Sequence, residues 1–228
     1  MESVNLNRIF RTFLIFLTAF SLSSCFELIE DIRINSDGSG RFQLTLNLSQ
    51  SKTQVSRLLT RDSIAGSPIP KIQQIDSALH RATATLDAME GISDLSLETD
   101  YQNYIVKAGF SFSSIEHLDQ AFDTLQNGFS TPQKTIQLPV TYSQNNNQFS
   151  RAIENNFLAH LNDKIGNFGF GELLGAKLTS IYRFDNPVSN STIPTTRISS
   201  SKKSTMTKCT LKEFIENPAY ADLTITMQ

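Results

Sequence analysis

Residues 26–48 read FELIEDIRINSDGSGRFQLTLNL, and this stretch decides the first part of the fold. In residues 26–34 the apolar side chains at positions 26, 28, 32 and 34 share one parity, and Glu30 is the exception among them. Residues 41–48 alternate between polar and apolar without exception. Alternation with a period of two indicates a half-buried strand, and NSDGSG at 35–40 is a turn signal. The stretch therefore predicts a β-hairpin whose loop is longer than two residues.

Further along the chain, more strands alternate with short helices. Strands are predicted at 93–98, 104–112, 135–143, 148–151, 177–184, 205–209 and 223–227. Helices are predicted at 49–60, 72–89, from 115 to about 125, at 154–163 and after Thr210, with Ser113–Glu116 and Thr210–Glu213 as capping boxes. There is no regular strand–helix–strand alternation. The predicted class is therefore α+β, mostly antiparallel, with three or four helices inserted between strands.

The helix at 72–89 carries its apolar residues at spacings of three and four, from Ile72 to Met89. Such a stripe suits packing on a sheet face, and a coiled coil is the alternative. Residues 189–203 are rich in Ser, Thr and Asn and are predicted to form an exposed loop or an excursion at a sheet edge. Residues 25–228 are expected to form a single domain.

The N-terminus reads MESVNLNRIFRTFLIFLTAFSLSSC. Arg8 and Arg11 precede an apolar stretch from Thr12 to Leu22, which is too short to span a membrane but has the length of a signal-peptide core. Leu22, two small residues and Cys25 follow. This ending resembles the lipobox of bacterial lipoproteins.

The lipobox resemblance implies that residues 1–24 are a signal peptide, cleaved between Ser24 and Cys25. It also implies that the Cys25 thiol carries the lipid that anchors the mature chain. Two alternatives remain: a buried N-terminal helix with an incidental cysteine, and ordinary secretion with a free Cys25. Stable anchoring needs more than one acyl chain, and bacterial lipoproteins typically carry two or three.

The charge of the chain argues against nucleic acid as a partner. Of 20 basic and 22 acidic residues, Arg8, Arg11 and Glu2 lie in the signal peptide, so 18 and 21 remain, a net charge near −3. Binding to nucleic acid needs a clustered basic surface. Cys25 and Cys209 are the two cysteines of the chain, and acylation of Cys25 excludes a disulfide between them. Cys209 is predicted to be a half-buried strand residue.

The sequence carries no recognisable catalytic or metal motif, so no enzyme activity, metal or cofactor is expected. The glycines at 166, 169 and 171 do not follow a phosphate-loop order, and His80, His117 and His160 have no metal-ligand spacing. Asp37 begins a turn that lacks a full calcium ligand set. Arg183 and Asp185 could form a site near a strand end, but a surface ion pair is the simpler reading.

Three segments carry a resemblance to a family. They are CFELIEDIRINSDGSGRFQLTLNLSQSK at 25–52, IYRFDNPVSN at 181–190 and TLKEFIENP at 210–218. They resemble a group of uncharacterised lipoproteins from Bacteroidetes-type bacteria and, more distantly, LppM-like lipoproteins. The latter resemblance implies a domain linked to lipid or glycolipid binding. It carries over no functional residue except Cys25.

The leading hypothesis is a non-enzymatic cell-envelope lipoprotein with a membrane-tethered binding or scaffolding domain. A lipid or glycolipid carrier is the alternative, and an envelope hydrolase is a third. The expected partners are the membrane, through the lipid on Cys25, and an envelope protein or lipid. The expected location is the outer membrane, on its periplasmic or surface face. Because the first strand begins one residue after Cys25, Glu27, Glu30 and Asp31 are expected to lie close to the membrane surface.

Overall fold

The computed structural model describes residues 26–64, 67–129, 140–154 and 174–228, and these form two main sheets, one two-stranded sheet and four α-helices. The large sheet has seven strands. In spatial order they are β11 (Arg197–Ile198), β12 (Ser204–Thr210), β9 (Lys177–Phe184), β1 (Glu27–Ile34), β2 (Gly40–Asn47), β6 (Ile105–Phe112) and β5 (Ile92–Asp100). The small sheet has four, in the order β10 (Val188–Ser191), β13 (Leu223–Met227), β8 (Gln148–Ile153) and β7 (Val140–Asn145). The α+β class, mostly antiparallel, is confirmed.

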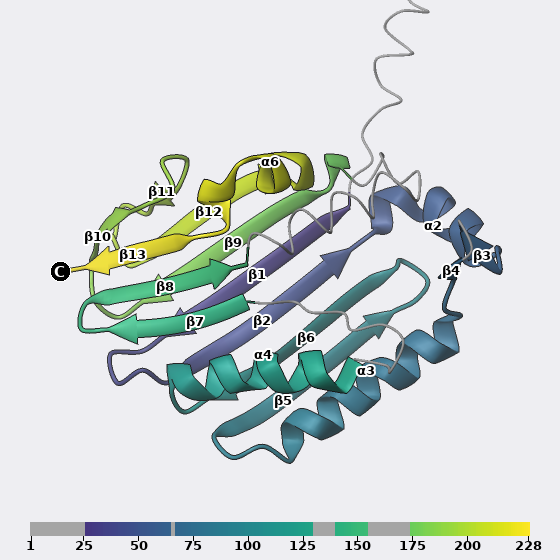
Figure 1. The fold of residues 1–228 in the computed structure, drawn as a ribbon, viewed down its shortest axis with the longest axis horizontal. Coiled ribbons are helices and arrows are strands. Elements are labelled where there is room, and N and C mark those ends of the chain that lie inside the picture. Colours follow the sequence, from purple (N-terminus) through teal and green to yellow (C-terminus); the bar gives the residue numbers. More distant parts are fainter. Residues whose placement is uncertain (1–25, 65–66, 130–139, 155–173) are drawn as a thin grey trace, which may run out of the picture.

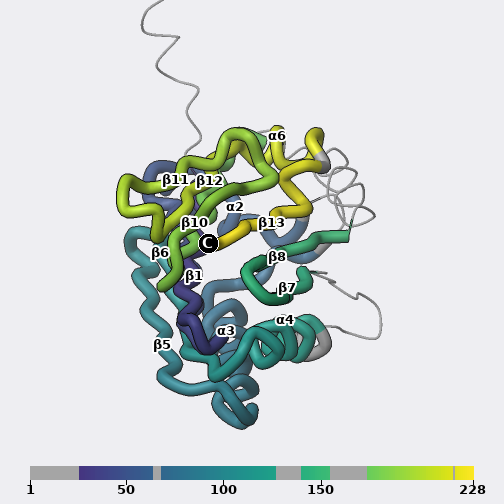
Figure 2. Tube along the Cα trace, turned by 90° about the vertical axis from the view of Figure 1, so that its left-hand side faces the viewer, coloured from purple at the N-terminus to yellow at the C-terminus, as the bar shows by residue number. Residues whose placement is uncertain are grey.

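The remaining elements are short or helical. They are η1 (Ser49–Ser51), α2 (Lys52–Leu59), the two-residue strands β3 (Ser63–Ile64) and β4 (Ser67–Pro68), α3 (Ile72–Asp87), α4 (Ile115–Phe129), α6 (Leu211–Glu216) and η3 (Pro218–Tyr220). The small sheet lies in front of one half of the large sheet, and α4 and α3 lie in front of the other half (Figure 1). The view turned by 90° shows the same two layers from the side (Figure 2).

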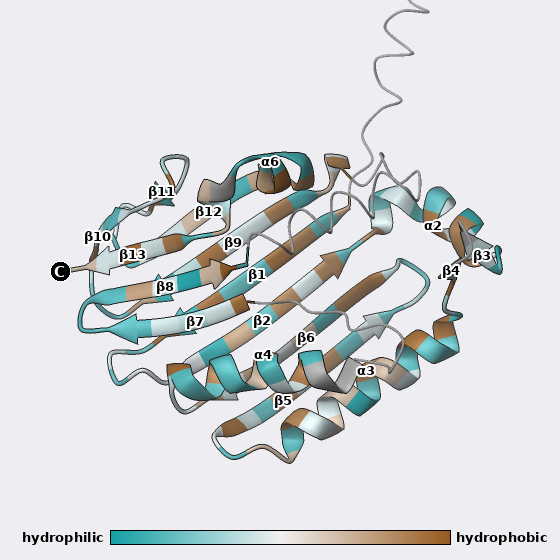
Figure 3. Cartoon of the chain, viewed as in Figure 1, coloured by the Kyte–Doolittle hydropathy of each residue, from teal (hydrophilic) through white to brown (hydrophobic). Residues whose placement is uncertain are grey.

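The opening hairpin is present as predicted, and a glycine fixes its geometry. β1 and β2 pair antiparallel from Glu27 opposite Asn47 to Ile34 opposite Gly40. A Cβ on Gly40 would lie 2.0 Å from the carbonyl oxygen of Arg33 and 2.4 Å from the ring of Phe112, so no other residue fits there. Polar and apolar residues alternate along both strands (Figure 3). The side chains of Ile32, Ile34 and Phe42 define what we call the inner face of the large sheet.

One strand pair departs from the antiparallel pattern. β9 runs parallel to β1, in register from Lys177 beside Glu27 to Phe184 beside Ile34. A parallel neighbour requires a crossover connection, and here it spans residues 35–176. The pairing joins the first strand of the domain to its C-terminal third. The N-terminal and C-terminal parts of the domain therefore meet in the middle of the large sheet.

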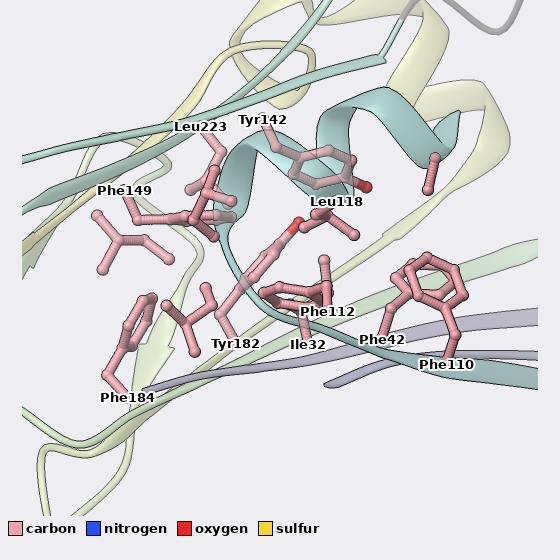
Figure 4. Packing of buried hydrophobic residues seen from close by; sticks show 14 of the residues in the cluster. Ile32, Phe42, Phe110, Phe112, Leu118, Tyr142, Phe149, Tyr182, Phe184 and Leu223 are labelled. Atoms are coloured by element: carbon pink, nitrogen blue, oxygen red, sulfur yellow. The ribbon is translucent and has the colours of Figure 1, made fainter. Parts of the chain in front are cut away.

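Aromatic rings fill the space between the two layers. Ring contacts with centroids 5.1–6.2 Å apart run without a break through Phe110, Phe42, Phe122, Tyr142, Phe149 and Tyr182. Figure 4 shows most of these rings together with Leu118 and Leu223 from the covering layer. Aromatic pairs at these separations add attraction beyond the burial of area. This part of the core is filled.

The second layer is continuous because α4 lies directly beside β7. The Asp119 carboxylate on α4 accepts a 2.7 Å hydrogen bond from the backbone N–H of Tyr142 on β7, the edge strand of the small sheet. Ile115, Leu118 and Ala121 of the same helix are buried in the core. The helix therefore continues the small sheet across the face of the large one.

Several boundary predictions differ from the structure in detail. The stripe of α3 is half-buried except at Leu86, because this helix packs on the edge strand β5 and on α4. The first capping residue is Ser114, whose hydroxyl accepts from the backbone N–H of His117, rather than Ser113. The capping box at Thr210 and Glu213 is confirmed.

Residues 189–203 contribute an edge strand to each sheet. They include most of β10 and all of β11, which match the predicted edge excursion, and most of their side chains are exposed. Ile193 is the exception, at 3% exposed, and it joins the core. The predicted helix at 154–163, the glycines at 166–171 and residues 135–139 of a predicted strand lie outside the described residues, apart from Glu154.

Candidate functional site

The inner face of the large sheet is built from cross-strand rows, and their composition changes along β1. Two rows consist of buried residues apart from the half-buried Gly40: Tyr182, Ile32, Phe42 and Phe110, and then Phe184, Ile34, Gly40 and Phe112. The next row toward the start of β1 contains Ser180, Glu30, Leu44 and Ala108. The last contains Leu178, Leu28, Leu46 and Val106, and we call it the apolar row. Glu30 thus lies between the filled core and the apolar row.

Glu30 is the centre of a buried polar cluster, which also contains Tyr142, Arg151, Ser180 and Tyr182. The hydroxyl of Tyr142 donates to Glu30 Oε1 at 2.5 Å, and that of Tyr182 donates to Oε2 at 2.8 Å. Arg151 Nη1 lies 3.4 Å from Oε2. Figure 4 shows the two tyrosine rings reaching into the core from different layers, Tyr182 from the large sheet and Tyr142 from the covering layer. The carboxylate is therefore held by groups from both sheets.

Arg151, on β8 of the small sheet, supplies the positive charge of the cluster. Its guanidinium donates to the backbone carbonyl of Tyr220 at 2.6 Å and to the hydroxyl of Ser180 at 3.4 Å. The ring of Phe214 lies 6.0 Å from the guanidinium carbon. The residue is 6% exposed, and no described residue accepts from its Nε. An arginine this deep in a core requires a counter-charge, which Glu30 supplies.

Burial sets the protonation states of the cluster. It raises the pKa of Tyr142 well above its ordinary value, and the neighbouring Glu30 raises it further. The pKa of Tyr182 is also raised by burial; Arg151 opposes this increase, whereas Glu30 adds to it. Burial disfavours the charge on Arg151, but its interactions with Tyr182 and Glu30 outweigh this effect and raise the pKa of the guanidinium. Both tyrosines therefore stay neutral hydrogen-bond donors, and the arginine stays charged.

The cluster is suited to holding the layers together rather than to acid–base chemistry. Each oxygen of Glu30 already accepts a hydrogen bond, and the tyrosines are too weakly acidic to exchange protons near neutral pH. Cys209 is on β12, next to the strand β9 that carries Ser180 and Tyr182, and lies opposite Leu178. Burial and then Glu213 raise the pKa of its thiol to about 11. A thiol with a raised pKa is a poor nucleophile, and Cys209 is half-buried as predicted.

Sequence patterns alone did not predict this cluster, although Glu30 stands out as an exception in an apolar row. The Glu30 side chain is 14% exposed and points between the two sheets; its proximity to a membrane surface stays a prediction. Asp31 lies on the opposite face and forms a two-pronged ion pair with Arg183 at 2.8–3.2 Å. The exception to the alternation was the available signal, since a charge in an apolar row needs a buried partner.

The other residues considered from sequence form no shared hydrogen-bonded cluster among the described residues, although Arg183 and Asp185 line the same hollow. Arg183 and Asp185 do not pair with each other, because Asp185 instead accepts from the backbone N–H of Ser36 at 3.1 Å. His80 is exposed and lies 3.8 Å from Asp76, while His117 hydrogen-bonds to Ser113 and Ser114 at 3.0 Å. Asp37 accepts from Ser39 within its turn.

Ser24 and Cys25 lie outside the described residues. Within the ranges that the structure describes, no three side chains of the metal-binding types are gathered at one point. In the same ranges, no helix has the length and apolar character needed to cross a membrane.

Removing Arg151 should destabilise the fold strongly. In Arg151→Met the carboxylate of Glu30 stays buried without its counter-charge, which costs about 3–5 kcal/mol of the free energy of unfolding. The double variant Glu30→Leu with Arg151→Met should be more stable than Arg151→Met alone. Lys212→Met is the control, because the Lys212–Glu216 pair is exposed and 3.9 Å apart, and should change stability by less than about 1 kcal/mol. Urea unfolding measures all three, and an Arg151→Met cost no larger than the control would contradict the buried ion pair.

Alkaline pH should unfold the protein through Tyr142 and Tyr182. Their folded pKa values are raised, so their stabilising effect is complete below the unfolded pKa of about 10 and is lost as the pH rises above it. Tyrosinate absorbance should show both phenols ionising only as the circular dichroism of the fold disappears. Tyr142→Phe should remove one of these late ionisations. Ionisation of all five tyrosines in the folded protein would contradict the assignment.

Comparisons with known proteins give one structural likeness. No family model matches this sequence, and no curated protein matches it significantly. The fold is similar to the folded domain of the LppM protein of Mycobacterium tuberculosis, solved by NMR. The TM-score is 0.44 and the identity 11%, over 89% of each chain. Relatedness to LppM-like lipoproteins and membership of a Bacteroidetes-type lipoprotein group both stay predictions.

Proposed function

We propose that this chain is a non-enzymatic cell-envelope lipoprotein, anchored through Cys25, whose domain binds an apolar ligand along the apolar row. The row is the observation that carries the proposal. Leu28 is 36% exposed although it faces the same side as the fully buried Ile32. Leu46, Val106 and Leu178 of the same row are half-buried. The inner face thus ends in a set of apolar side chains that the fold leaves partly uncovered, a feature typical of binding surfaces.

The position of the row supports a ligand from the membrane. Leu28 is three residues after Cys25, at the end of β1 where a lipid on that cysteine would be attached. A β1 strand paired on both sides leaves little slack between anchor and domain. The apolar row would then lie near the bilayer, within reach of an acyl chain. A lipid or glycolipid is therefore the favoured ligand class, and a binding or scaffolding role toward an envelope protein is the second candidate.

The polar cluster supports a binding role over a catalytic one. Its donors and acceptors are engaged with one another, and its ion pair closes the filled core immediately beside the apolar row. A rigid, charged boundary of this kind would stop an apolar ligand from entering further. The cluster would define the inner end of the binding surface without taking part in a reaction.

The anchor is tested by labelling cells with radioactive palmitate. The wild-type chain should carry label and fractionate with membranes. Cys25→Ala should lose the label and accumulate as uncleaved or mislocalised precursor. Equal labelling of both proteins would remove the basis of the lipoprotein assignment.

Ligand binding is tested with a fluorescent fatty acid and the full-length protein in an uncharged detergent. Leu28→Ser should weaken binding about tenfold or more, since burying a leucine side chain contributes about 1.5–3 kcal/mol. Ile198→Ser is the matched control, because Ile198 is a comparably exposed apolar residue (39%) in the distant edge strand β11. Binding that is absent, or equally weak in both variants, would leave the protein-scaffold role as the better account.

A further inference from the structure

The outer face of the large sheet carries a row of three arginines. Arg33 on β1 lies directly opposite Arg41 on β2 and, on its other side, beside Arg183 on β9. Side chains at such positions have Cβ atoms about 4.5–5.5 Å apart, and like charges there are destabilising. A sheet that is otherwise free to place polar residues on its solvent face gains nothing in folding from this arrangement.

The charges in the row are only partly neutralised within the described residues. Asp31 pairs with Arg183 through Nε and Nη2, and no described residue accepts from Nη1. Arg41 donates at 3.3–3.4 Å to neutral oxygens only, those of Asp94, Ser96 and Ser111. Arg33 has no hydrogen-bond acceptor or acidic partner among the described residues.

An open hollow of about 290 Å³ lies beside the row. Arg33 and Arg183 line it from the sheet, and Ser201, Lys203 and Ser204 line it from the β11–β12 hairpin and its turn. Asp185 is the acidic residue of its lining, and its carboxylate accepts from the backbone N–H of Ser36. No described residue pairs with the ammonium of Lys203. Three cations therefore face one hollow, together with two hydroxyls that can donate.

We propose that this hollow binds the phosphate group of a phosphorylated ligand. Guanidinium groups donate in pairs to oxyanions, and an ammonium adds a point charge. The donor residues line the hollow from the sheet and from the hairpin. A tetrahedral phosphate accepts from such directions at once, whereas a planar carboxylate engages one fork. A bound phosphate would also remove the repulsion within the arginine row.

The source of the phosphate is a lipid headgroup or a soluble phosphorylated compound. The hollow lies at the C-terminal end of β1, and Glu27 lies at its N-terminal end. The eight residues of the strand separate these two ends by roughly 26 Å. An anchor at Cys25 would therefore leave the hollow facing away from that membrane, which favours the soluble source. The proposal is independent of the apolar row, which lies on the other face of the sheet.

The test uses the full-length protein in an uncharged detergent, with tripolyphosphate as the probe in isothermal titration calorimetry at fixed ionic strength. The wild type should bind. Arg33→Ala and Lys203→Ala should each weaken binding at least about tenfold. Lys177→Ala is the matched control, because Lys177 is exposed on the same face of β9 at its far end, and should change affinity less than about twofold.

Nanodiscs with and without phosphatidylglycerol provide the second arm. Binding of tripolyphosphate alone assigns the hollow to soluble phosphates. Recruitment to phosphatidylglycerol that depends on Arg33 and Lys203 assigns it to headgroups. Arg33 and Lys203 are exposed and their side chains make no contact on which folding would depend, and circular dichroism checks this. Absence of binding to either probe, or an equal loss in Lys177→Ala, overturns the proposal.

Discussion

The structure depends on covering the inner face of a seven-stranded sheet. That face presents a nearly continuous apolar surface, and a domain of this size cannot leave it in water. The four strands of the small sheet are too few to cover it, so α4 and α3 complete the second layer beside β7. The positions of two other features follow. The aromatic contacts fill the space where the two layers meet, and the apolar row is the part of the face that the layers leave half-covered.

The Glu30–Arg151 pair lies across this junction, where a buried ion pair has a particular consequence. Replacing such a pair with well-packed apolar residues is often neutral in stability, whereas separating its two halves is costly. The small sheet could slide over an apolar surface with little change in contact area. A carboxylate that must meet Tyr142, Tyr182 and Arg151 at once allows one position. The pair therefore selects the register of the two layers more than it adds to their attraction.

The parts of the fold that were predicted from sequence are those governed by neighbours along the chain. The alternation in β1, β2 and β13 and the capping box at Thr210 follow from local spacing, and the structure contains each of them. The parallel pairing of β1 with β9 joins residues about 150 positions apart, and no local pattern encodes it. The same separation hid the cluster. Glu30 was visible as an exception, but its partners at 142, 151 and 182 look like ordinary strand residues until the layers are stacked.

Charged residues are paired and enclosed on the inner face of the large sheet but stand side by side on its outer face. The different free-energy cost of an unpaired charge on the two faces explains this. On the inner face a charge is removed from water, which is costly unless the charge has a partner. Glu30 and Arg151 therefore occur together and are enclosed by tyrosines. On the outer face water screens each charge, so Arg33, Arg41 and Arg183 can stand side by side at moderate cost. Folding alone requires the first arrangement and merely tolerates the second. The repulsion among the three arginines is concentrated beside the hollow. Selection for a ligand would maintain such a repulsion, and in this the arginine row differs from an ordinary polar surface.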